Sequence, residues 1–195
     1  MFFRNLKELN LYLNNFTDCE IFNLRQKTDN MPNLELLFLG SNIFNWKNEK
    51  KEDNNKKYDL TSLKLVGLTN GVFDTFSLTF FERFQFYKLE ALYISRNDFI
   101  SLSFIDGLDL PFLKNFSIHT SHINEFEPLK KFKTLEEIDM RDNYIKDINN
   151  LFSFIKDLPN LKNFDLSGND IDKNLEENKS IISRINDKFK IELII

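Results

Sequence analysis

Apolar and polar residues alternate along this chain in a pattern that recurs at intervals of 22 to 29 residues. In the clearest copies an apolar residue is followed by others three and five positions later, and an asparagine comes three positions after that. Seven copies begin at Leu6, Leu34, Leu60, Leu89, Leu113, Leu135 and Leu161. Self-similarity at a period of this length is typical of a protein built from stacked repeats. The sequence therefore predicts a single repeat domain over residues 1–195.

The spacing within each copy predicts a short strand. Two apolar residues separated by one position, such as Leu37 and Leu39, place both side chains on one face of an extended chain. The residues between them then point to the opposite face. One repeat cannot shield its own apolar face from water, so neighbouring repeats are expected to stack.

Two copies depart from the pattern. The third is aligned on Leu60, Leu63 and Leu65, which puts Leu68 where the asparagine is expected. The fifth has Ser121 at that position. We expect a local irregularity at the third repeat.

The motif Leu-x-x-Leu-x-Leu-x-x-Asn-x-Leu resembles the leucine-rich-repeat family over nearly the whole chain. The resemblance implies an α/β repeat solenoid with a curved parallel β-sheet on the concave face and helices, 3₁₀ turns and loops on the convex face. It also implies a ladder of polar side chains that bond backbone groups of the turns, since an amide both donates and accepts hydrogen bonds. The expected ladder residues are Asn14, Asn42, Asn97, Ser121, Asn143 and Asn169.

The segments that return from one strand to the next are predicted to vary. The apolar spacing over residues 73–84 indicates a helix. Over residues 123–132 an apolar residue recurs every three positions, which suits a tight 3₁₀ return segment. Residues 45–58 are charged and nearly free of aliphatic side chains, which predicts a solvated loop insertion. Residues 172–195 are expected to form a C-terminal helix and strand. Because that strand is an apolar edge, end-to-end self-association or a longer array is a further expectation.

Composition narrows the function classes. The net charge of −4 gives no basic face for nucleic acid. No segment approaches the roughly 20 apolar residues of a membrane span. The single cysteine, Cys19, and the lack of a signal-peptide pattern favour a reducing compartment, cytoplasmic or nuclear.

Catalytic signatures are missing from the sequence. There is no phosphate-binding glycine loop and no nucleophile elbow. His119 and His122 form half a zinc site at most. We therefore expect a protein that is not an enzyme and that uses neither a cofactor nor a metal.

The outward strand positions are the expected surface for a protein partner. Those singled out as partner-binding are Tyr12, Leu36, Phe38, Val66, Tyr93, His119, Asp139, Arg141 and Asp165. Aromatic groups at one end and charged groups at the other are typical of protein interfaces. The function predicted is a non-catalytic interaction module or scaffold that binds a partner protein on its concave face.

Two alternatives remain open at the level of sequence. One is a GTPase-activating or other enzyme-regulatory subunit, for which Arg96 and Arg141 are candidate residues acting in trans. The other is the substrate receptor of a ubiquitin ligase. The identity of the partner distinguishes these roles.

Overall fold

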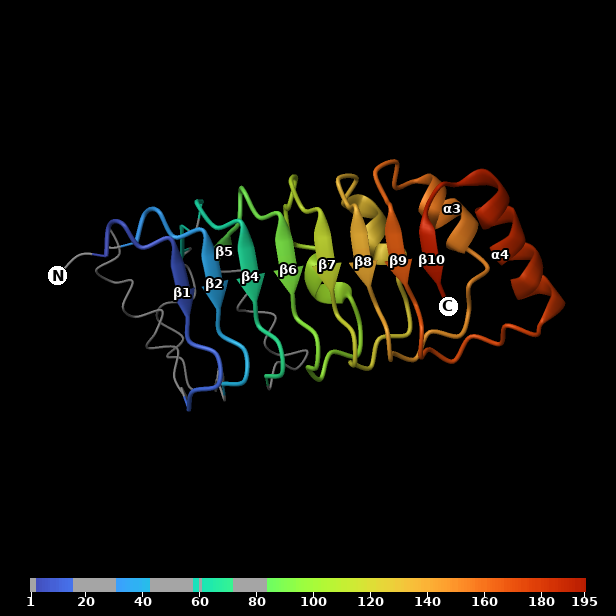
Figure 1. The fold of residues 1–195 in the computed structure, drawn as a ribbon, viewed down its shortest axis with the longest axis horizontal. Coiled ribbons are helices and arrows are strands. Elements are labelled where there is room, and N and C mark those ends of the chain that lie inside the picture. Colours follow the sequence, from blue (N-terminus) through green and yellow to red (C-terminus); the bar gives the residue numbers. More distant parts are fainter. Residues whose placement is uncertain (1–2, 16–30, 43–57, 60, 72–83) are drawn as a thin grey trace.

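The computed structural model describes residues 3–15, 31–42, 58–59, 61–71 and 84–195. Within them, eight short strands lie side by side in one parallel sheet (Figure 1). In order across the sheet they are β1 (Glu8–Asn10), β2 (Leu36–Phe38), β4 (Leu65–Gly67), β6 (Ala91–Tyr93), β7 (Asn115–Ser117), β8 (Glu137–Asp139), β9 (Asn163–Asp165) and β10 (Glu192–Ile194). The sheet follows chain order because each repeat contributes the next strand.

A continuous column of apolar side chains holds the repeats together. The central residues of adjacent strands are paired in register, as Leu92 is with Phe116 and Ile138 with Phe164. These four side chains are at most 2% exposed. Each repeat thus removes its neighbour's apolar face from water, which is the main source of stability in a stacked fold.

The segments opposite the sheet differ from repeat to repeat. They include the 3₁₀ helices η5 (Ser103–Ile105) and η6 (Glu127–Lys131) and the helices α3 (Leu151–Lys156) and α4 (Glu176–Lys188). Helix η6 is the tight 3₁₀ return segment that the apolar spacing of three predicts for this 22-residue repeat. The C-terminal region expected to form a helix and a strand consists of α4 and β10. The seven repeat motifs predict seven strands, and β10 joins the same sheet as an eighth.

Two predicted segments lie largely outside the described residues. They are the charged loop over residues 45–58 and the helix over residues 73–84. At their ends, Tyr58 and Asp59 form strand β3, which pairs with strand β5 (Phe84–Gln85) in a separate two-stranded parallel sheet.

The sequence alignment of the third repeat is wrong by three residues. Strand β4 pairs Val66 with Leu37 on one side and with Leu92 on the other. The repeat therefore begins at Leu63, and Leu68 is a fully buried core residue at the level of Leu39. In the corrected alignment, Gly71 and not Leu68 occupies the position of the ladder asparagine. The N–H of Gly71 donates to Asn97 Oδ1 at 3.0 Å.

A left-handed residue precedes the ladder position in all seven complete repeats. These residues are Leu13, Ser41, Asn70, Arg96, Thr120, Asp142 and Gly168, with φ between 53° and 72°. The conformation is unfavourable for residues other than glycine. Asn70 occupies this position in the third repeat, which agrees with the shifted alignment.

In four repeats the ladder asparagine joins its turn to the preceding repeat. Asn143 Nδ2 donates to the carbonyl oxygens of Ile118, Met140 and Arg141 at 3.0 to 3.2 Å, and Asn143 Oδ1 accepts the N–H of Ile123 at 3.1 Å. Equivalent bonds reach back one repeat from Asn42 to Leu11, from Asn97 to Leu68 and from Asn169 to Met140. Among the described residues, Asn14 bonds only carbonyls of its own turn, those of Leu11 and Tyr12.

Two positions interrupt this ladder among the described residues: Gly71 has no side chain, and the side chain of Ser121 forms no hydrogen bond. Its Oγ is buried and has no hydrogen-bond partner in the described part of the chain. The side chain is too short to reach the carbonyls that an asparagine contacts in the neighbouring repeats. A buried hydroxyl without a partner destabilises the folded state by about 1 to 3 kcal/mol.

Replacing Ser121 with asparagine is expected to raise the free energy of unfolding by about 1 to 2 kcal/mol. The new amide would donate to the carbonyl oxygens of Ile94 and Ile118, the counterparts of the two that Asn143 joins. Urea denaturation followed by circular dichroism measures the change. The Ser121→Ala variant is the control, and its stability should equal or slightly exceed that of the wild type. A clear loss of stability in both variants would show that the hydroxyl is bonded in solution.

Candidate functional site

The outward residues of the sheet form one continuous surface, here called the strand face. In β2, β8 and β9 the central side chain is buried while the residues on either side are partly or fully accessible. These flanking residues line up across the sheet because the strands are paired in register. The surface rests on a rigid core rather than on loops, which suits a binding site.

One residue predicted to bind a partner does not belong to this surface. Val66 is the central residue of β4 and is only 1% exposed. Its place on the strand face is taken by Leu65 and Gly67, which the sequence pattern missed. The Asn70-Gly71 pair was the signal that could have found them, because asparagine and glycine favour the left-handed turn that follows each strand.

Between β2 and β6 the strand face is apolar and aromatic, whereas β1 contributes Glu8 and Asn10. Phe38 lies over the backbone of the next strand, since a Cβ atom added to Gly67 would be 2.9 Å from Phe38 Cδ1. Tyr12 leans on Gly40 in the same way, at 3.0 Å from such an atom. A side chain at Gly67 would displace the Phe38 ring, and one at Gly40 would first meet the backbone oxygen of Thr69, 2.4 Å from the added Cβ atom. We call Leu36, Phe38, Leu65 and Tyr93 the apolar half of the strand face.

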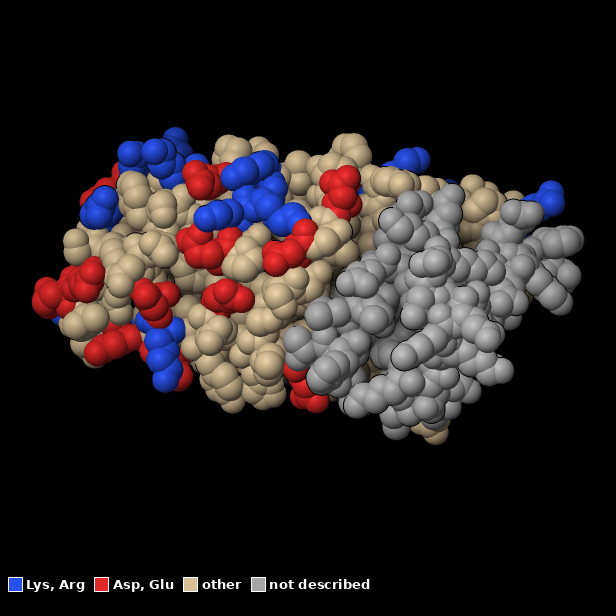
Figure 2. Space-filling view, turned by 180° about the vertical axis from the view of Figure 1, so that it is seen from behind, with Lys and Arg blue, Asp and Glu red and all other residues tan. Residues whose placement is uncertain are grey.

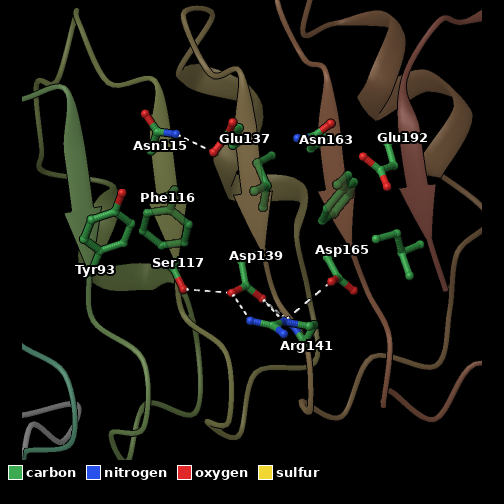
Figure 3. Close-up of a pocket in the computed structure, with 13 residues that line it drawn as sticks. Tyr93, Asn115, Phe116, Ser117, Glu137, Asp139, Arg141, Asn163, Asp165 and Glu192 are labelled. Atoms are coloured by element: carbon green, nitrogen blue, oxygen red, sulfur yellow. Dashed lines mark hydrogen bonds and ion pairs between the residues drawn. The ribbon is translucent and has the colours of Figure 1, made fainter.

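A hollow of about 400 Å³ occupies the C-terminal half (Figure 3). Its polar lining includes four carboxylates, those of Glu137, Asp139, Asp165 and Glu192, and one guanidinium, that of Arg141. Tyr93 closes the side toward the apolar half. We call this feature the acidic hollow.

Arg141 organises the floor of the acidic hollow. Its Nε and Nη2 donate to the two carboxylate oxygens of Asp139, each at 2.9 Å, and its Nε lies 3.5 Å from Asp165 Oδ2. Burial raises the pKa of Asp139, but the hydrogen bonds from Arg141 outweigh this effect and hold the pKa below its usual value. Asp139 therefore stays ionised, and its carboxylate raises the pKa of Arg141 in turn.

A chain of hydrogen bonds runs from the residues that follow β6 to the acidic hollow. Ser95 Oγ and Ser117 Oγ are 2.7 Å apart, and Ser117 Oγ donates to Asp139 Oδ2 at 3.3 Å. The backbone N–H of His119 donates to Ser95 Oγ at 3.0 Å. Burial lowers the pKa of the His119 imidazole, and burial raises the pKa of Tyr93, with the charge of Glu137 adding to the latter effect. These polar groups are thus fixed in a partly desolvated surface.

A second charge pattern runs along the edge where the strands begin. The residue after the first leucine of each repeat alternates in sign across the sheet: Lys7, Glu35, Lys64, Glu90, Lys114, Glu136 and Lys162. Lys64 and Lys114 bond Glu35 and Glu90 at 2.8 and 2.7 Å, and Lys162 is paired with Glu136. We call this row the charge ladder. Its charges largely neutralise one another, whereas those of the acidic hollow do not.

The described part of the face turned away in Figure 1 shows no comparable cluster of uncompensated like charges. Acidic and basic side chains are interspersed over its described part (Figure 2). Among the described residues there is also no group of three histidine, cysteine or acidic side chains arranged to hold a metal ion. No helix in those residues is long and apolar enough to cross a membrane.

The in-register parallel sheet, the left-handed turns and the asparagine ladder define a leucine-rich-repeat solenoid, and the chain has this fold. The solved structures that it resembles belong to the same fold. Internalin C2 of Listeria monocytogenes is 24% identical with a TM-score of 0.57, over 98% of this chain and 70% of that one. A leucine-rich-repeat protein of Leptospira interrogans is 21% identical with a TM-score of 0.63, over 98% of this chain and 49% of that one.

Sequence comparison adds one curated relative. Protein PAC2 of Saccharomyces cerevisiae is 28% identical over 87% of this chain. The chain spans only 36% of the length of that protein. No protein-family model matches the chain.

Proposed function

We propose that this chain is a non-catalytic protein-interaction module that binds a partner protein on its strand face. The observation that carries the proposal is the organisation of this face. Aromatic side chains on a rigid sheet adjoin a hollow with fixed charges. Aromatic side chains are enriched at the energetic centres of protein interfaces, and fixed charges add specificity through electrostatic complementarity. The solved structures of the same fold support the repeat architecture on which the face is built.

In the described part of the strand face, Arg141 is not placed to act on a nucleotide bound to a partner. A GTPase-activating role needs an arginine that can extend to a partner's nucleotide. The guanidinium of Arg141 is instead held by Asp139 and lies beside Asp165. We therefore assign Arg141 the role of orienting these carboxylates. A GTP hydrolysis assay with small GTPases tests the alternative, and acceleration that is lost in Arg141→Lys would support it.

Removing an aromatic ring from the strand face is expected to weaken partner binding without unfolding the protein. Phe38→Ala and Tyr93→Ala should each reduce the free energy of binding by about 1 to 3 kcal/mol. Both side chains are only partly buried, so thermal unfolding should change little. The partner is first recovered by affinity capture with the wild-type chain and then purified, and its affinity is measured by calorimetry.

Phe112→Ala is the matched control for these two variants. Its ring is 54% exposed and lies outside the strand face, just before the first leucine of the fifth repeat. The proposal expects this variant to bind like the wild type. Equal affinities for all three variants and the wild type would contradict it.

A further inference from the structure

The two halves of the strand face differ in charge as well as in polarity. The apolar half carries no ionised side chain, whereas the acidic hollow has four carboxylates and one guanidinium. One guanidinium offsets only one of the four carboxylates, so three negative charges are in excess, and Glu137 and Glu192 are the two carboxylates that Arg141 does not contact. These two residues lie on the first positions of β8 and β10, on either side of Asn163 (Figure 3).

Neither Glu137 nor Glu192 has a cation beside it. Among the described residues, no lysine or arginine nitrogen is within salt-bridge distance of either carboxylate. Glu137 accepts one hydrogen bond, from Asn115 Nδ2 at 2.7 Å. The carboxylates of the charge ladder are different, because a lysine of an adjacent repeat neutralises each of them. The hollow therefore gathers uncompensated carboxylates of three neighbouring strands, while Glu8 on β1 is a further unpaired carboxylate at the other end of the described strand face.

We propose that the strand face binds an extended segment of the partner that carries an arginine or lysine together with an apolar side chain. The cation enters the acidic hollow between Glu137 and Glu192, and the apolar side chain rests on Phe38 and Leu65. An arginine fits best, since its planar guanidinium donates to two carboxylates at once. This inference rests on the proposed function and adds the chemistry of the partner.

The sheet geometry sets the spacing between the two anchor residues. Neighbouring strands are about 4.8 Å apart, so Glu137 and Glu192, two strands apart, flank a gap of about 10 Å. Leu65 on β4 is three strands from β8 and four from β9, or about 14 to 19 Å. An extended chain advances about 3.4 Å per residue. The cation and the apolar residue should therefore be separated by about four to six positions.

A random library of twelve-residue peptides displayed on phage tests this inference with the full chain as the target. We expect enrichment of peptides with arginine or lysine about four to six positions from a leucine or an aromatic residue. One enriched peptide is then synthesised, and its affinity is measured by calorimetry. For the double variant Glu137→Gln/Glu192→Gln the dissociation constant should rise at least about tenfold, and the dependence on salt should weaken.

The double variant Glu90→Gln/Glu136→Gln is the matched control. It removes the same number of negative charges, but from the charge ladder, and should bind the peptide like the wild type. Equal losses in both double variants would overturn the inference in favour of a general effect of net charge. Enrichment of acidic peptides, or no enrichment of basic ones, would also overturn it.

The inference and the proposed function can fail separately. If enriched peptides lack a cation but lose affinity in Phe38→Ala, the strand face binds partners and only the partner chemistry is wrong. If basic peptides bind equally well to Phe38→Ala and to both double variants, they bind elsewhere, and both proposals fail for this probe.

Discussion

Replacing Asn143 with alanine is expected to lower the free energy of unfolding by about 3 kcal/mol. The asparagine is buried, and its side chain bonds three carbonyl oxygens and one N–H from two successive repeats. Alanine removes these bonds and leaves the carbonyl of Ile118 and the N–H of Ile123 without a partner among the described residues, whereas Met140 O still accepts from Asn169 Nδ2 and Arg141 O from the N–H of Thr120. Because the groups of Ile118 and Ile123 belong to the preceding repeat, the loss also weakens the contact between repeats. Urea denaturation monitored by circular dichroism measures the effect.

Asn14 provides the internal control. It has the same place in the first repeat, but it is exposed, and its bonds within the described part of the chain stay in its own turn. Asn14→Ala should therefore change the stability by less than about 1 kcal/mol, because water can replace the lost bonds. Similar losses in the two variants would mean that the ladder acts within single turns and does not join repeats.

Replacing Phe164 with alanine is expected to have a still larger effect, a loss of about 3 to 5 kcal/mol. The ring is fully buried at the centre of β9, and its centroid lies 6.0 Å from that of Phe126 and 5.5 Å from that of Phe154. Phe126 belongs to the return segment of the fifth repeat and Phe154 to that of the sixth. The cavity would therefore open where the fifth, sixth and seventh repeats meet. The rigid return segments on either side limit how far the structure can collapse into it.

Phe112→Ala again serves as the control, because more than half of that side chain is exposed. Its stability should be close to that of the wild type. A loss of less than about 1 kcal/mol in Phe164→Ala, measured by the same denaturation, would contradict the continuous core described above.

The sequence pattern predicted the fold where each position of the repeat is filled by the expected residue type. It failed at the third repeat because leucines there fit two alignments three residues apart. Leu63 serves as the first apolar residue in one and the second in the other. The strand-face residues Leu65 and Gly67 could not be placed without the correct alignment. The eighth strand was not assigned to the repeat pattern because Lys190 stands where other repeats have leucine.

The left-handed turns were also beyond prediction from single residues. Leu13 and Thr120 have φ values of 58° and 53°, although neither residue type favours this conformation. The bonds of the neighbouring ladder side chains and the stacking of repeats offset the strain in most turns. At Thr120 the following ladder residue is Ser121, which contributes no such bond. This turn combines strain with an incomplete ladder.

The candidate site was predictable in outline and not in its electrostatics. Alternation along the strands was enough to predict that Phe38, Tyr93 and Asp165 flank the buried positions. The pairing of Arg141 with Asp139 depends on side-chain geometry that spacing does not encode. The contrast between neutralised and uncompensated carboxylates depends on which residues of different repeats become neighbours. That information exists only once all repeats are aligned in space.

Site-specific photo-cross-linking to the bound partner tests the central claim most directly. A photoreactive amino acid is placed on the strand face at Leu36 or Asn163, and on the opposite side at Lys130 in η6 or Ser153 in α3. The account predicts cross-links to the partner from the two strand-face positions and none from the other two. Cross-links confined to Lys130 and Ser153 would contradict it.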